Sequence, residues 1–190
     1  MAKAKVSRNL EALPRLKMIL IGAPMNEVLT SITRLIEAHS TGMLCSIFLL
    51  GLDSLHMRYG VAASLPEAYR AAADGICSGP DVGSCGTAAY LRQPVFVSDI
   101  ASDPRWVKFK DVALQSGLRA AWATPIMSLD GKVLETFGMY YREVRQPGPG
   151  RNSADRLRQP HRRNRHRARS VARCPDKGMR RVSTPPALLG

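Results

Sequence analysis

Cys85 is the residue whose type and surroundings most directly suggest chemistry. It lies in the glycine-rich segment 79–86, just before residues 87–91, which are predicted to be helical. A thiol beside a helix start can have a lowered pKa and act as a nucleophile. The alternative is a buried cysteine that serves as a small apolar side chain. That is the commoner role of a free cysteine and the one that we expect here.

Two acidic residues, Asp99 and Asp103, flank Ile100 in a predicted loop. Either carboxylate could contact a ligand or a metal ion. Asp103 directly precedes Pro104, however, and this pair is typical of a helix start. We therefore expect Asp103 to cap a helical turn, and we keep Asp99 and Ile100 as candidate ligand contacts.

Thr87 and the two tryptophans are further candidates for ligand binding. Thr87 lies at the predicted helix start, where backbone N–H groups favour an anionic ligand, although a capping role fits it better. Trp106 and Trp122 could line an apolar pocket, or they could fill the core.

The cysteines and histidines form no recognisable metal or general-base site. No two cysteines have the CxxC spacing, and no histidine lies at zinc-finger spacing from a pair of cysteines. The histidines do not gather with carboxylates either. We therefore expect neither a metal ion nor a catalytic residue. The residues considered are Cys45, Cys77, Cys85, Cys174, His39, His56, His161 and His166.

The basic character of the chain is concentrated in its last forty residues. The net charge of the 190 residues is +13, but residues 151–190 contain 12 of the 28 basic and only 2 of the 15 acidic side chains. Residues 1–150 thus carry 16 basic and 13 acidic side chains, a net charge of +3. Since a binding surface for nucleic acid needs clustered positive charge, only the tail could supply one.

Three interpretations of residues 146–190 stay open. Apolar residues are too scattered there for a buried face, which favours disorder. The segment could be an arm that binds nucleic acid or another anionic surface, or a solvated tail without a function. It could also be the product of a frameshift in a GC-rich coding region, because it is rich in Arg, Pro, Ala, Gly and His. Aromatic stacking residues are absent from it, so we do not expect nucleic-acid binding.

Hydrophobic periodicity predicts helices at the start of the chain and strands after them. The expected helices span 7–21 (interrupted at Pro14), 25–39, 66–73 and 87–91, with a helical turn from Asp103. The expected strands span 43–50, 55–62, 95–97, 120–127 and 133–141.

Short links between successive strands predict an antiparallel sheet with helices packed on it, an α+β fold. No apolar run approaches the 20 or so residues that a membrane helix needs, and no signal peptide is recognisable. We therefore expect a cytoplasmic protein without a membrane contact.

Several motifs agree with one family in order and spacing. They are GPDVGSCGTAAY at 79–90, PVFVSDI at 94–100, DPRW at 103–106, GLRAAWATPI at 117–126 and GKVL at 131–134. Together they resemble the GAF domains of bacterial signalling proteins, most closely those beside histidine kinase, diguanylate cyclase and cyclic-di-GMP phosphodiesterase modules. The resemblance covers residues 24–145. It leaves 1–23 as an N-terminal helix and linker and 146–190 as a basic tail.

The resemblance implies a GAF-like (profilin-like) antiparallel sheet of five to six strands, with helices on one face and a small-molecule pocket on the other. It also implies a homodimer through the terminal helices and an output domain. Neither the family's final helix nor an output domain is recognisable after residue 141, so we expect a truncated fragment of a larger sensor. The implied pocket residues are Gly83, Ser84, Cys85, Thr87, Asp99, Ile100, Trp106 and Trp122.

The expected function is therefore non-catalytic sensing of a small ligand. The first alternative is a free-methionine-sulfoxide reductase that uses Cys85, because such GAF enzymes have a cysteine in a similar Gly-x-Cys-Gly setting. The second is binding of nucleic acid or an anionic surface through the tail. The sequence signatures of cyclic-nucleotide binding and of bilin binding are absent, so the sequence identifies no ligand or cofactor.

Overall fold

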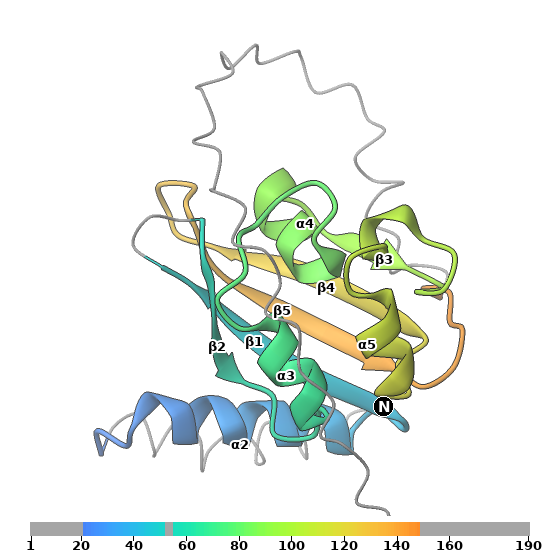
Figure 1. Cartoon of the computed structure of the whole chain (residues 1–190). Coiled ribbons are helices and arrows are strands. Elements are labelled where there is room, and N and C mark those ends of the chain that lie inside the picture. Colours follow the sequence, from blue (N-terminus) through green and yellow to red (C-terminus); the bar gives the residue numbers. More distant parts are fainter. Residues whose placement is uncertain (1–20, 52–54, 149–190) are drawn as a thin grey trace, which may run out of the picture.

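The computed structural model describes residues 21–51 and 55–148 (Figure 1). These residues form five strands, four α-helices and one 3-10 turn. In order, the elements are α2 (Met25–Ala38), β1 (Met43–Leu50), β2 (Met57–Val61), α3 (Glu67–Ala73), α4 (Gly83–Leu91), β3 (Val95–Val97), the 3-10 turn η1 (Pro104–Trp106), α5 (Lys110–Gln115), β4 (Ala120–Met127) and β5 (Val133–Tyr141).

The five strands form one antiparallel sheet in the order β2-β1-β5-β4-β3. Four strands have the predicted bounds, and β2 lies within its predicted range. β1 and β5 are central neighbours, and Met43 pairs with Tyr141 at the end of their ladder. The predicted α+β GAF-like fold class is therefore confirmed.

Side chains alternate between two faces of the sheet, as the period of a strand requires. One face contributes Met43, Cys45, Ala120, Trp122 and Tyr141 to a buried cluster, with Phe96, Phe137 and Met139 packed against it. The other face contributes Phe48, Val95, Val97, Ala121, Ala123 and Tyr140 to a larger cluster. We call them the α2 face and the α4 face, after the helices that contact them.

Helix α2 lies on the first face, against β1 and β2 (Figure 1). Its predicted apolar stripe is only partly covered: Val28 is buried, but Leu29 and Ile32 are half-buried. Glu37 connects the helix to its surroundings, because its carboxylate accepts hydrogen bonds from Cys45 N at 2.7 Å and from Ser64 Oγ at 2.6 Å.

The second face is covered by α3, α4, η1 and α5 (Figure 1), so the sheet has helices on both sides. Helix α4 begins at Gly83, four residues before the predicted start at Thr87. The glycines in its first turn disfavour a helix locally, so residue propensities do not predict this start. Packing on β4 and β5 stabilises the helix instead. Helix α5 was not predicted either, because its six residues are too few for a periodic pattern.

The predicted helix at 7–21 and most of the tail at 146–190 lie outside the described residues. Within residues 21–51 and 55–148, no helix is long and apolar enough to cross a membrane.

Candidate functional site

A small cavity lies between α4, η1 and the α4 face of the sheet. Its volume is about 20 Å³, which is room for about one water molecule. Its walls come from five segments of the chain and contain no charged side chain. They are Phe48, Met57, Tyr69, Ala73, Ile76, Val82, Gly83, Ser84, Cys85, Trp106 and Phe109.

Two glycines make this arrangement possible. Gly83 has φ +56°, and a Cβ there would lie 3.5 Å from the Trp106 ring, so a side chain at this position would be strained. A Cβ on Gly138 would lie 2.6 Å from Ser46 Oγ and 2.9 Å from Cys85 Sγ. Gly138 therefore lets α4 bring Cys85 down onto the sheet.

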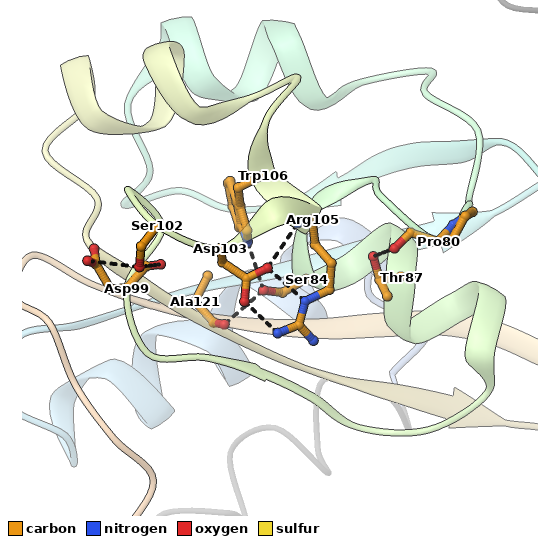
Figure 2. A network of polar contacts seen from close by, with 9 residues as sticks. All are labelled: Pro80, Ser84, Thr87, Asp99, Ser102, Asp103, Arg105, Trp106 and Ala121. Atoms are coloured by element: carbon orange, nitrogen blue, oxygen red, sulfur yellow. Dashed lines mark hydrogen bonds and ion pairs between the residues drawn. The ribbon is translucent and has the colours of Figure 1, made fainter.

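Trp106 connects three segments through Ser84. Its indole Nε1 donates to Ser84 Oγ at 3.3 Å, and Ser84 Oγ donates to the backbone oxygen of Ala121 at 2.8 Å (Figure 2). The Trp106 ring also stacks on Tyr69, with centroids 6.3 Å apart. These contacts hold η1, α4 and β4 together beside the cavity.

A group of buried polar side chains lies beneath α4. Tyr140 Oη shares hydrogen bonds with Ser46 Oγ at 3.2 Å and with Cys85 Sγ at 3.4 Å, and it accepts one from Tyr69 Oη at 3.5 Å. Thr136, on the same strand as Tyr140, is 0% exposed, and its hydroxyl is close enough to the Cys85 thiol to offset part of the rise in pKa that burial causes there. Buried polar side chains are costly unless they are paired with one another, so this group is a candidate site.

Burial keeps these groups in their neutral forms. It raises the pKa of the Cys85 thiol, although the hydrogen bond from Tyr140 opposes the shift. Burial, together with the neighbouring Cys85, also raises the pKa values of Tyr69 and Tyr140. A nucleophilic cysteine needs a lowered pKa and access to solvent, whereas Cys85 is only 6% exposed.

Charged residues lie at the rim of the site, next to Trp106. Asp103 caps η1 as predicted, by accepting from Arg105 N at 2.9 Å, and its carboxylate also pairs with the Arg105 side chain (Figure 2). Burial opposes ionisation of Asp103, but the hydrogen bonds and charge of Arg105 outweigh it and lower the pKa of the carboxyl.

The structure brings together Gly83, Ser84, Cys85 and Trp106 of the eight predicted pocket residues. Thr87 lies within α4 rather than at its start, and its hydroxyl donates to the backbone oxygen of Pro80.

The other three predicted residues also lie away from the cavity. Asp99 stabilises its own loop through Ala101 N and Ser102 Oγ (Figure 2), and Ile100 fills the core. Trp122 lies on the α2 face, because strand alternation directs it away from its neighbour Ala121. Trp122 therefore lies on the opposite face of the sheet from the cavity.

Sequence reasoning missed Ser46, Tyr69 and Tyr140, which surround the Cys85 thiol. The predicted alternation of strand 133–141 already separates Tyr140 from Phe137 and Met139, so it could have identified Tyr140 as facing the loops. Nothing in the sequence indicates which residue of the helix at 66–73 reaches it.

No group of three or more potential metal ligands occurs in the part of the chain that the structure describes.

A family model described as a GAF domain matches residues 22–150. The chain belongs to the GAF domain family. Part of this GAF domain protein is 37% identical over 132 residues to the methyl sulfide methyltransferase-associated sensor of Methanosarcina acetivorans. The match covers 70% of the chain but only 13% of that relative.

Solved structures agree with this assignment at the level of the fold. A GAF sensor protein from Burkholderia vietnamiensis superimposes with a TM-score of 0.56 at 17% identity, over 78% of this chain and 85% of that one. Free methionine-R-sulfoxide reductase from Neisseria meningitidis, in complex with its substrate, gives a TM-score of 0.52 at 15% identity, over 72% and 75% of the two chains. The GAF fold thus occurs in both a sensor and an enzyme.

Proposed function

We propose that this GAF domain is a non-catalytic sensory module that binds a small molecule at the cavity under α4. The observation that carries the proposal is the cavity, whose apolar walls meet a small set of buried polar groups as the walls of ligand sites do, although it is far smaller than such a site until Trp106 moves. The similarity to a protein described as a sensor supports it.

Trp106 gives the binding event a structural consequence. A ligand larger than a water molecule does not fit a cavity of about 20 Å³, so it must displace the Trp106 ring or a neighbouring wall. Displacement would break the hydrogen-bonded connection from Trp106 through Ser84 to β4. Ligand binding would thereby change how η1 and α4 pack on the sheet, which a signalling protein could read.

The proposal is tested by native mass spectrometry of the purified protein, followed by a thermal-shift screen against a metabolite panel. We expect a co-purified small molecule, or at least one panel member that raises the midpoint temperature. A ligand that binds only the folded state stabilises it by mass action.

Ala73→Val is the test variant and Ala120→Val its matched control. Both alanines are buried, but Ala73 lines the cavity and Ala120 lies on the α2 face. Two added methyl groups should fill the cavity and abolish the shift caused by the ligand, while Ala120→Val retains it. No shift in the wild type with any compound, or equal loss in both variants, would contradict the proposal.

The burial and raised pKa of Cys85 support binding rather than reductase chemistry. The other described free cysteine, Cys45, lies on the opposite face of the sheet and cannot resolve an intermediate on Cys85. We therefore expect no turnover of free methionine sulfoxide with a thiol reductant. Turnover that Cys85→Ser abolishes would replace the sensory proposal by the enzymatic one.

A further inference from the structure

The cavity under α4 presents no charged side chain to a ligand. All eleven residues around it are apolar or carry an uncharged polar group, namely a hydroxyl, a thiol or an indole N–H. A charged ligand buried among them would lose its hydration without gaining a counter-ion, and such a transfer is strongly unfavourable.

The charged residues at the rim are already engaged with each other. Arg105 Nε donates to Asp103 Oδ1 at 2.8 Å, and Arg105 Nη2 lies 2.5 Å from Asp103 Oδ2 (Figure 2). Such a two-pronged pair satisfies both partners. Neither residue lines the cavity. An anionic or cationic ligand would therefore have to break this pair to find a partner.

Neutral hydrogen-bonding capacity, in contrast, is plentiful. The Tyr69 hydroxyl donates to Tyr140 and keeps lone pairs that can accept, and the Cys85 thiol shares one hydrogen bond with Tyr140. The hydroxyls can rotate, so the group can meet either a donor or an acceptor.

We propose that the ligand of this domain is an uncharged, compact and mainly apolar molecule with one hydrogen-bonding oxygen, nitrogen or sulfur atom. The polar atom meets the Tyr69 hydroxyl and the Cys85 thiol, and the apolar body takes the place of the Trp106 ring against Met57 and Phe109. This inference rests on the proposed function. The raised pKa values of Cys85 and Tyr69 agree with it, because burial there disfavours negative charge.

Four probes of equal ring size separate charge from polarity: cyclopentanone, cyclopentane, cyclopentanecarboxylate and cyclopentylammonium. The chain has two tryptophans, one on each face, so the two indole N–H signals in a ¹⁵N spectrum report the two faces separately. Trp122→Phe assigns the signals. We expect cyclopentanone to shift the Trp106 signal most, cyclopentane to shift it less, and the two ions to leave it unchanged. The Trp122 signal should not move.

Tyr69→Phe and Tyr141→Phe provide a matched pair of variants. Each removes one buried hydroxyl and keeps the ring, but Tyr141 lies on the α2 face, where its hydroxyl donates to Met43 Sδ at 3.4 Å. Loss of one hydrogen bond should weaken cyclopentanone binding about 3- to 10-fold in Tyr69→Phe. Tyr69→Phe should bind cyclopentane as tightly as the wild type does. Tyr141→Phe should bind both cyclopentanone and cyclopentane with wild-type affinity.

The outcomes test separately whether the ligand is uncharged and whether the binding site exists. If either ion shifts the Trp106 signal as strongly as cyclopentanone, the uncharged-ligand inference is wrong while the binding site stands. If cyclopentane binds as tightly as cyclopentanone, the polar part of the inference is wrong. If none of the probes moves the Trp106 signal and the metabolite screen is also negative, both the inference and the proposed function are overturned.

Discussion

The two faces of the same sheet bury different kinds of side chain. On the α2 face, Met43, Cys45, Trp122 and Tyr141 pack into an aromatic and sulfur-rich cluster against which Ile36 of α2 packs. On the α4 face, hydroxyls and a thiol are buried together beside a cavity, and short helices cover them. Strands β1 and β5 contribute to both, so alternate residues of one strand belong to the apolar cluster and to the candidate site.

This difference is what we expect of a small domain in which one face supplies stability and the other supplies the proposed binding site. An apolar cluster gains stability from burial without any geometric demand on hydrogen bonds. A buried polar group stabilises little unless all its members are satisfied, so it needs a functional reason. The α4 face is therefore where we expect substitutions to alter binding, and the α2 face is where we expect them to alter stability alone.

The largest effect is expected from removing the tryptophans. Trp106→Ala and Trp122→Ala each delete a side chain that is at most 3% exposed, so each should lower the free energy of unfolding by about 3–5 kcal/mol in urea titrations. Only Trp106→Ala should be restabilised by added indole, because that deletion enlarges an existing cavity. Equal rescue of Trp122→Ala would remove the distinction between the faces.

Gly138→Ala should have the next largest effect. The added methyl group would lie under 3 Å from atoms of Ser46 and Cys85, which are buried and cannot move away cheaply. We expect a loss of about 1–3 kcal/mol in unfolding free energy. Gly148→Ala is the control, because a Cβ there meets nothing within 4 Å. Ser46→Ala in the Gly138→Ala background should recover part of the loss, and no recovery would count against the contact.

Tyr140→Phe and Tyr141→Phe compare the two faces at adjacent residues of β5. Removing the Tyr140 hydroxyl leaves Ser46, Cys85 and Tyr69 each short of a partner, so we expect a loss of about 1–2 kcal/mol in unfolding free energy. Tyr141→Phe removes a weak hydrogen bond to sulfur on the α2 face and should cost less. If Tyr141→Phe loses more unfolding free energy than Tyr140→Phe in the same urea titration, this expectation is wrong.

The last effect is absent at neutral pH and appears only at alkaline pH. Burial, reinforced by the charge of Glu37, raises the pKa of the Cys45 thiol from 9.0 to about 12. Above pH 9 the unfolded chain therefore loses this proton before the folded chain does, and stability falls between pH 9 and 12. The fall is at most about 1.4 kcal/mol per pH unit for one group.

Cys45→Ala tests this dependence on pH. It should flatten the decline of unfolding free energy between pH 9 and 11, relative to the wild type. Cys85→Ala should flatten it as well, because burial also raises the pKa of Cys85. An unchanged slope in Cys45→Ala would show that the thiol is not protected from ionisation by the fold.

Most of the fold could be predicted from the sequence because its strands are strongly patterned. Apolar runs such as 43–50 and 133–141 end at turn residues, and the structure keeps those bounds. The start of α4 could not be predicted, because Gly83 and Gly86 oppose a helix locally and only packing on β4 and β5 stabilises it.

The candidate site could be predicted only in part. Motif resemblance marked Gly83, Ser84, Cys85 and Trp106, which lie along one stretch of the chain and do meet at the cavity. It misplaced Trp122, although the alternation of β4 separates that residue from Ala121. The partners of Cys85 come from β1, α3 and β5, up to 55 residues away in the chain, and only the tertiary fold brings them together.

The pairing of Met43 with Tyr141 has a consequence for how such a domain is built into larger proteins. The chain enters the sheet at the start of β1 and leaves it at the end of β5, and these two points are neighbours at one edge of the sheet. A domain with this geometry can be inserted between other modules without moving them far apart. Any motion of the central strands would then reach the segments before and after the domain at a single point.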